Sequence, residues 1–181
     1  LGLGLGHTVA LVGTNRHEWI ETASALATIG VVTVPVNWHF SADEIAYVLE
    51  NSSATAIVAD AEFADTARAA AEQAGIRIRI AFGGAIDGFV DYDELLASGS
   101  TDEPEDLLAG STMFYTSGTT GRPKGVSSSA FPAGGDVFES RDRLALLMML
   151  YQAPVDGVVL CNAPLYHAGP LAMCFVPFAC G

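Results

Sequence analysis

Basic residues are scarce in this sequence of 181 residues. Eight Lys and Arg stand against 21 Asp and Glu, so the formal net charge is −13. A chain this acidic is repelled by nucleic acid and by anionic membranes, which argues against both as surface partners. Lysine occurs once, at Lys124. We therefore expect the few cations, and Lys124 above all, to have a specific role.

Cysteine is scarce too, and no long apolar run is present. Cys161, Cys174 and Cys180 lie late in the chain in apolar surroundings, without the spacing of a metal site. We interpret them as reduced thiols, which suit a cytosolic protein. No apolar run reaches the roughly 20 residues of a membrane-spanning helix, and no signal peptide is visible. These absences predict a cytoplasmic protein without a transmembrane segment.

The ends of the sequence also lack the usual features of termini. The first residue is Leu rather than Met, and the sequence stops within the apolar segment 171–178. Natural termini are usually polar and exposed. We therefore expect a piece of a longer protein, although half of the residues are apolar and 181 residues can bury a core.

Strand and helix patterns alternate over the first half of the sequence. Short runs rich in β-branched residues predict strands at 9–13, 31–36, 54–60 and 76–81. Helical spacing of apolar residues predicts a helix before Gly30, with Thr14 and Asn15 as a possible cap. Two more helices are predicted, one opened by a capping box of Ser41 and Glu44 and one at 63–74.

This alternation is typical of a doubly wound α/β fold with a mostly parallel sheet and right-handed crossovers. Ligands of such sheets bind at the carboxyl ends of the strands. The turns at 13–15 and 35–37 are therefore candidate edges of a site, and the alternative is that they are ordinary connections.

The second half is less regular. We expect a short helix at 91–96, an acidic connector at 98–106, a helix at 137–152 and a strand at 155–160. The connector could hold a cation, but a solvated linker is the better interpretation. It divides the chain into a first lobe, residues 1–106, and the start of a second lobe, residues 107–181.

The segment 115–126 reads Tyr-Thr-Ser-Gly-Thr-Thr-Gly-Arg-Pro-Lys-Gly-Val and carries the clearest chemistry. Hydroxyl side chains alternate with glycines, so hydrogen-bond donors are dense and little bulk keeps a phosphate from the backbone. The spacing is not that of the P-loop NTPases. Their pattern has four residues between its first Gly and a Gly-Lys-Ser/Thr sequence, whereas Pro123 stands five residues after Gly118 and Lys124 is followed by Gly125. Extended residues flank the segment on both sides, so we expect a hairpin whose loop binds phosphate.

With this segment in view, the sequence resembles the adenylate-forming superfamily of acyl- and aryl-CoA synthetases, luciferases and peptide-synthetase adenylation domains. The likeness is strongest to bacterial fatty-acyl-CoA ligases. Segment 115–126 matches the superfamily signature, 164–167 resembles its Pro-Leu-aromatic-His segment, and 30–49 resembles the first lobe. The sequence departs from the pattern at His39, where an Arg is common, and at Ser127, where a His is usual.

The resemblance implies an ATP-dependent carboxylate–CoA ligase, an acid–thiol ligase that forms an acyl-adenylate and then an acyl-CoA, with ATP, Mg²⁺ and CoA taking part. A fatty acid is the expected carboxylate. His167 would be catalytic and would favour the pentavalent transition state, with Tyr166 beside it. No residue is assigned to metal. The β- and γ-phosphates would be held by Thr116, Ser117, Gly118, Thr119, Thr120, Gly121 and Lys124.

Two alternatives remain open. An adenylating domain could load a carrier-protein thiol instead of CoA, or the chain could be a non-catalytic nucleotide- or acyl-binding module. The superfamily's adenine- and ribose-binding motifs and its carboxylate-activating lysine are absent from this sequence, since Lys124 belongs to the signature. We therefore expect the isolated piece not to turn over.

Overall fold

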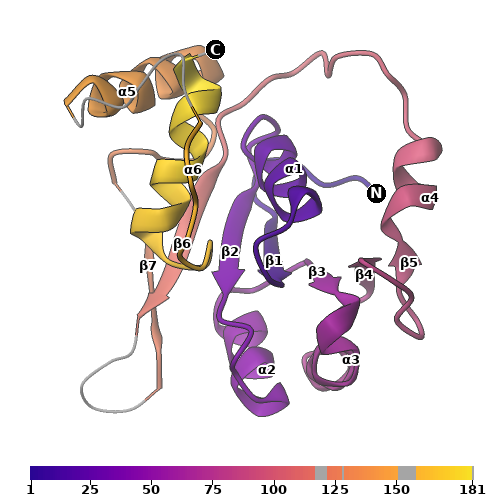
Figure 1. Cartoon of the computed structure of the whole chain (residues 1–181). Helices are drawn as coiled ribbons and strands as arrows, with labels where there is room; N and C mark the ends of the chain where they lie inside the picture. Colours follow the sequence, from indigo (N-terminus) through magenta and orange to yellow (C-terminus); the bar gives the residue numbers. More distant parts are fainter. Residues whose placement is uncertain (117–121, 128, 151–157, 181) are drawn as a thin grey trace.

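The computed structural model describes residues 1–116, 122–127, 129–150 and 158–180, without the side chains of 147–150 and 176–180. Figure 1 shows the arrangement of its elements. In chain order they are β1 (Thr8–Val12), α1 (His17–Leu26), β2 (Val32–Val36), α2 (Ala42–Asn51), β3 (Ala56–Asp60), the 3₁₀ turn η1 (Ala61–Phe63), α3 (Ala64–Gln73), β4 (Ile78–Phe82), β5 (Val90–Asp91), α4 (Tyr92–Ala97), β6 (Ser111–Thr116), β7 (Lys124–Ser127), α5 (Val137–Leu150) and α6 (Ala168–Cys180).

The described strands form one sheet in the order β5-β4-β3-β1-β2-β6-β7. Every neighbouring pair is parallel except β6 and β7, which are antiparallel. The predicted doubly wound, mostly parallel sheet is therefore confirmed. The chain steps from β1 to β2 on one side and then returns past β1 to β3, which creates a topological switch point beside β1.

The apolar side chains of β1 alternate between two buried clusters. Val9 and Leu11 pack with Trp19 of α1, and Leu171 of α6 belongs to the same cluster. Ala10 and Val12 face the cluster that α2 and α3 cover. Helices thus bury both faces of the central strands, which explains why these strands read as nearly continuous apolar runs.

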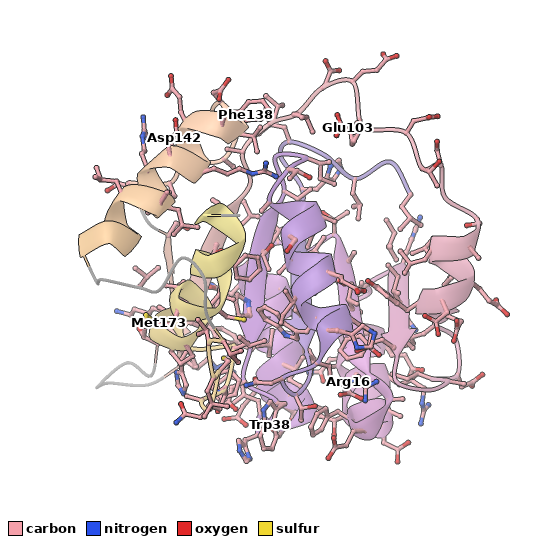
Figure 2. All side chains as sticks on the ribbon, turned by 45° about the horizontal axis from the view of Figure 1, so that its top comes forward. Arg16, Trp38, Glu103, Phe138, Asp142 and Met173 are labelled. Atoms are coloured by element: carbon pink, nitrogen blue, oxygen red, sulfur yellow. The ribbon has the colours of Figure 1, made fainter. Side chains whose placement is uncertain are left out.

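Strand β6 extends the first part of the sheet by pairing with β2, with Val32 opposite Ser111 and Thr33 opposite Thr112. The acidic connector before it is exposed from residue 98 to residue 106. It runs around the outside of the molecule (Figure 1), and Glu103 projects from it in Figure 2. The sheet is continuous across the predicted boundary at 106 and 107, so the division into two lobes stays a prediction.

The predicted helix cap at Thr14 and Asn15 is wrong. The N-cap residue of α1 is Arg16, which is extended and makes no side-chain cap hydrogen bond. Thr14 donates to Asp60 and Asn15 donates to Ala163 instead, so both side chains bond distant residues rather than the helix end. The capping box of Ser41 and Glu44 in α2 is confirmed.

The end of the chain differs more from the prediction. Residues 158–160 form no strand, and 155–157 lie outside the described residues, so the strand predicted at 155–160 is wrong where it can be compared. Helix α6 was not predicted. Pro170 occupies its third position, where a proline is tolerated because the first N–H groups of a helix have no partner within it.

Candidate functional site

The phosphate-loop segment forms the predicted hairpin. Thr116 at the end of β6 lies opposite Lys124 at the start of β7, and both side chains are exposed. These two of the predicted phosphate-binding residues are therefore adjacent across the base of the loop. The others, Ser117, Gly118, Thr119, Thr120 and Gly121, lie outside the described residues. A hydroxyl and an ammonium group side by side suit an oxyanion such as phosphate.

Helix α2 contacts the hairpin at β6 and at the residues just before β7. The Tyr47 hydroxyl donates to the carbonyl oxygen of Pro123 at 3.2 Å, and the Arg122 guanidinium lies 4.9 Å from the centre of the Tyr47 ring. The Tyr115 hydroxyl donates to Oδ1 of Asn51 at 2.8 Å. Burial raises the pKa of Tyr115, which favours the protonated hydroxyl that donates this hydrogen bond. The described part of the hairpin is thus anchored on the first predicted lobe.

His167 stands directly before α6. Its N–H donates to the carbonyl oxygen of Pro164 at 3.1 Å, and its own carbonyl oxygen accepts from Leu171 at 3.0 Å. The His167 ring lies 4.4 Å from the Tyr166 ring at an angle of 51°, so the expected neighbour is present but tilted. The imidazole is exposed, whereas Leu165 two residues earlier is 2% exposed. A buried anchor therefore carries an accessible imidazole.

The base of the hairpin and the His167 segment lie at the same edge of the sheet. Asn15, which follows β1, bonds residues 163 and 165, and the loop follows the end of β6. Strands β1, β2 and β6 are parallel, so their carboxyl ends share one edge. Ligands of such sheets bind there. The turn at 13–15 lies at this edge, next to the segment that carries His167, and its role as an edge of the site stays a prediction.

The other polar groups near the switch point satisfy one another. Thr14 donates to Asp60 at 3.1 Å. Arg16 makes two hydrogen bonds to Glu18, at 2.6 and 3.0 Å, and this pairing holds the pKa of the nearly buried Glu18 below its usual range. In the second turn, Asn37 accepts from the backbone of His39. We interpret these contacts as structural.

An apolar cavity of about 340 Å³ opens beside α6. It lies between α1 and α6, which are neighbours in Figures 1 and 2, and reaches β2, β6 and α5. Ala168, the residue after His167, is part of its wall. The lining includes Ala23, Thr33, Phe114, Leu144, Leu171 and Phe175. Its volume and lining are in the range of small-molecule sites.

The candidate site therefore combines a hydroxyl–lysine pair and an exposed imidazole at one sheet edge with an apolar cavity that reaches from Ala168 along the sheet face to the start of β2 and β6. A family model described as "AMP-binding enzyme" matches residues 1–181, the whole of the chain. The chain belongs to the AMP-binding enzyme family. The resemblance drawn from segment 115–126 is confirmed by this match.

Similar proteins place the AMP-binding chain among larger enzymes. It is 28% identical to indoleacetate–CoA ligase of Aromatoleum aromaticum over 174 residues, 93% of this chain and 33% of the relative. It is 32% identical to feruloyl-CoA synthase of an Amycolatopsis species over 180 residues, 97% of this chain and 32% of the relative. The chain thus spans about a third of these curated relatives.

A solved structure agrees with the fold. The long-chain-fatty-acid-CoA ligase FadD1 of Archaeoglobus fulgidus matches with a TM-score of 0.75 and 25% identity, over 97% of this chain and 34% of that one. The AMP-binding chain therefore has the architecture of the N-terminal part of adenylate-forming enzymes. In the part of the chain that the structure describes, no helix is long and apolar enough to cross a membrane.

Sequence reasoning missed the contacts of three residues at this candidate site. Tyr47 and Asn51 lie one helical turn apart on α2, a spacing that places them on one face, but nothing in the sequence pointed that face toward the hairpin. Asn15 was assigned to a helix cap. Its residue type was a signal, because an amide can bond backbone as readily as it can cap a helix.

Proposed function

We propose that this chain is the N-terminal part of an ATP-dependent acyl-CoA ligase. A carboxylate attacks the α-phosphorus of ATP to give an acyl-adenylate and pyrophosphate, and the thiol of CoA then displaces AMP to give the acyl-CoA. The observation that carries the proposal is the pairing of Thr116 with Lys124 at the base of the signature hairpin in a chain of the AMP-binding family.

The hairpin residues have an electrostatic role in this proposal. Lys124 and the hydroxyls and backbone N–H groups of 116–121 take up the charge that grows on the departing pyrophosphate. Among the described residues no group of three or more His, Cys, Asp or Glu gathers as metal ligands. In this proposal Mg²⁺ binds together with the phosphates of ATP and shares their negative charge.

His167 is the proposed catalytic group for adenylation. Its exposed imidazole would face the carboxylate and the α-phosphate and stabilise the pentavalent transition state by hydrogen bonding. The apolar cavity that begins at Ala168 would take the chain behind that carboxylate. An apolar lining suits a fatty acyl chain, and we propose a fatty acid as substrate.

Two observations bear on the alternatives. The names of the relatives cover aromatic acids as well as fatty acids, so an aryl carboxylate is the competing substrate class. Cys161 and Cys174 are free thiols, which is in keeping with a reducing cytosol, where CoA and carrier proteins both occur. Competition between CoA and a carrier protein for the adenylate separates these two acceptors.

The test is pyrophosphate release by the full-length protein with a panel of fatty and aromatic acids. Lys124→Ala should lower kcat about a hundredfold, because it removes a charge from the leaving group, and should weaken ATP–Mg²⁺ binding in a calorimetric titration. Arg77→Ala is the matched control, since this exposed cation precedes β4 at the opposite edge of the sheet.

Each outcome separates the candidate functions. No release with any carboxylate would contradict the ligase. ATP binding without release would favour the non-catalytic module, and unchanged binding by Lys124→Ala would remove the hairpin from the site.

A further inference from the structure

The side chain of Asn15 joins the turn after β1 to the segment that carries His167. Asn15 follows β1, and its Nδ2 donates to the carbonyl oxygen of Ala163 at 2.9 Å. Its Oδ1 accepts from the N–H of Leu165 at 3.0 Å. The two partners lie 148 and 150 residues further along the chain. Both polar ends of this amide are therefore used by one short stretch of backbone.

These backbone groups belong to an irregular segment, since residue 163 is a bend and residues 165 and 166 form a turn. The side chain of Asn15 therefore bonds a stretch of backbone that has no strand or helix partner of its own among the described residues. Pro164 lies between Ala163 and Leu165 and has no N–H of its own. Asn suits this position because its amide carries a donor and an acceptor in one plane, whereas Asp offers acceptors only.

The segment that Asn15 holds leads straight to His167. On its other side, Leu165 is buried in the cluster that contains Leu11 and Trp19. The N–H of His167 donates back to Pro164 at 3.1 Å. The backbone of His167 is therefore tied to Pro164, which lies between the two residues that Asn15 bonds, and a shift of that segment moves the imidazole.

We propose that Asn15 is a positioning residue, whose amide holds the backbone of 163–165 so that His167 faces the reacting carboxylate and the α-phosphate. This role rests on the proposed ligase function. The β- and γ-phosphates meet the hairpin, which α2 holds independently through Tyr47. Loss of Asn15 therefore lowers kcat for pyrophosphate release and leaves KM for ATP nearly unchanged.

The test compares Asn15→Ala and Asn15→Asp in the full-length protein, each alone and combined with His167→Ala. Each single Asn15 variant should lower kcat by about tenfold to a hundredfold, since small misplacements of a reacting group have effects of this size. In the His167→Ala background the same changes should have little further effect, because no imidazole remains to be positioned. Asn162→Ala, an exposed asparagine of the same segment, is the matched control and keeps the wild-type kcat.

The measured couplings decide the proposal. If the effects of the Asn15 and His167 substitutions multiply, or if Asn15→Asp keeps full kcat, Asn15 does not act through His167. Thermal unfolding of every variant is measured as well; a fall in rate in both backgrounds together with a lower Tm assigns Asn15 a merely structural role. A wild-type protein that is inactive on every carboxylate would instead refute the ligase, and this role with it.

Discussion

At the level of single residues, side-chain amides and hydroxyls hold the described segments on which the proposed chemistry depends. Asn15, Tyr47 and Tyr115 each bond a residue more than 60 positions away. None of them is among the residues proposed to touch ATP or the carboxylate. They hold the segments whose residues are proposed to touch these ligands. A catalytic geometry depends on such supporting contacts as much as on the reacting residues themselves.

The thiol of Cys174 illustrates how burial at this level changes reactivity. Burial, with Cys161 beside it, raises the pKa of Cys174 from the usual 9.0 to about 11. The folded state therefore holds the thiol proton more tightly than the unfolded state. The stability that this group contributes is complete below pH 9 and is lost as the pH rises through 11.

We predict slow alkylation of Cys174 in the folded full-length protein. At pH 8, iodoacetamide should modify it roughly tenfold more slowly than in the same protein unfolded in urea, because the thiolate is the reactive form. Mass spectrometry of the peptide that contains Cys174 measures the rate. Equal rates in the two states would show that this thiol is not held protonated by the fold.

At the level of elements, α2 is the platform of the candidate site. Its capping box is closed by the backbone N–H of Ser41, which donates to Glu44 at 2.8 Å, and Ile45, Val48 and Leu49 are buried against the sheet. The side chains of Tyr47 and Asn51 reach the hairpin from the same helix. Helix α2 thus holds the described residues on either side of the loop, Tyr115 and Pro123.

The junction of β6 with the first part of the sheet depends on one glycine. A Cβ at Gly110 would lie 2.5 Å from the carbonyl oxygen of Leu26 and 2.6 Å from that of Val31. The backbone of 108–111 is tied to the same stretch, since Leu108 donates to Thr28 and Gly110 donates to Ala27. A side chain at position 110 would fit only if this backbone moved away from the carbonyl groups of Leu26 and Val31.

We expect Gly110→Ala to lower the free energy of unfolding by about 3 kcal/mol, because overpacking against backbone cannot be relieved by a rotamer change. Urea unfolding of the full-length protein measures it. Gly169→Ala is the control: a Cβ there meets nothing within 4 Å, and Ala is the better helix former in α6. Unchanged stability of Gly110→Ala would mean that this close approach is not a constraint.

At the scale of the whole molecule, the connector and the sheet have opposite effects on the predicted lobes. The connector at 98–106 is exposed throughout and separates them along the chain. The pairing of β6 with β2 and the contacts of the hairpin with α2 join them in space. A cut in the connector should therefore break the chain without breaking the fold.

A glutamyl endopeptidase should cut the folded full-length protein early after Glu105, an exposed residue of the connector. The two pieces should elute together in gel filtration, because the hydrogen bonds between β2 and β6 persist. Glu105→Gln should protect this site. Separate elution of two folded pieces would instead show that the predicted lobes are independent units.

Local patterns predicted the parts of the fold that depend on neighbouring residues. Runs of β-branched residues and helical spacing predicted β1 to β4 and the helices between them, because each element must bury an apolar face of fixed period. Ser41 and Glu44 predicted a cap that forms within four residues. Residues 115–126 predicted the hairpin and the family from their own spacing.

Only the tertiary structure decided which distant segments meet. The bonds of Asn15 to Ala163 and Leu165 and the contact of Tyr47 with Pro123 join residues 76 to 150 positions apart. A hydrogen bond over such a separation leaves no period in the sequence, and the same side chain can satisfy a local partner equally well. The sequence by itself therefore determined the elements and the chemistry of the signature, whereas packing determined which side chains hold that chemistry in place.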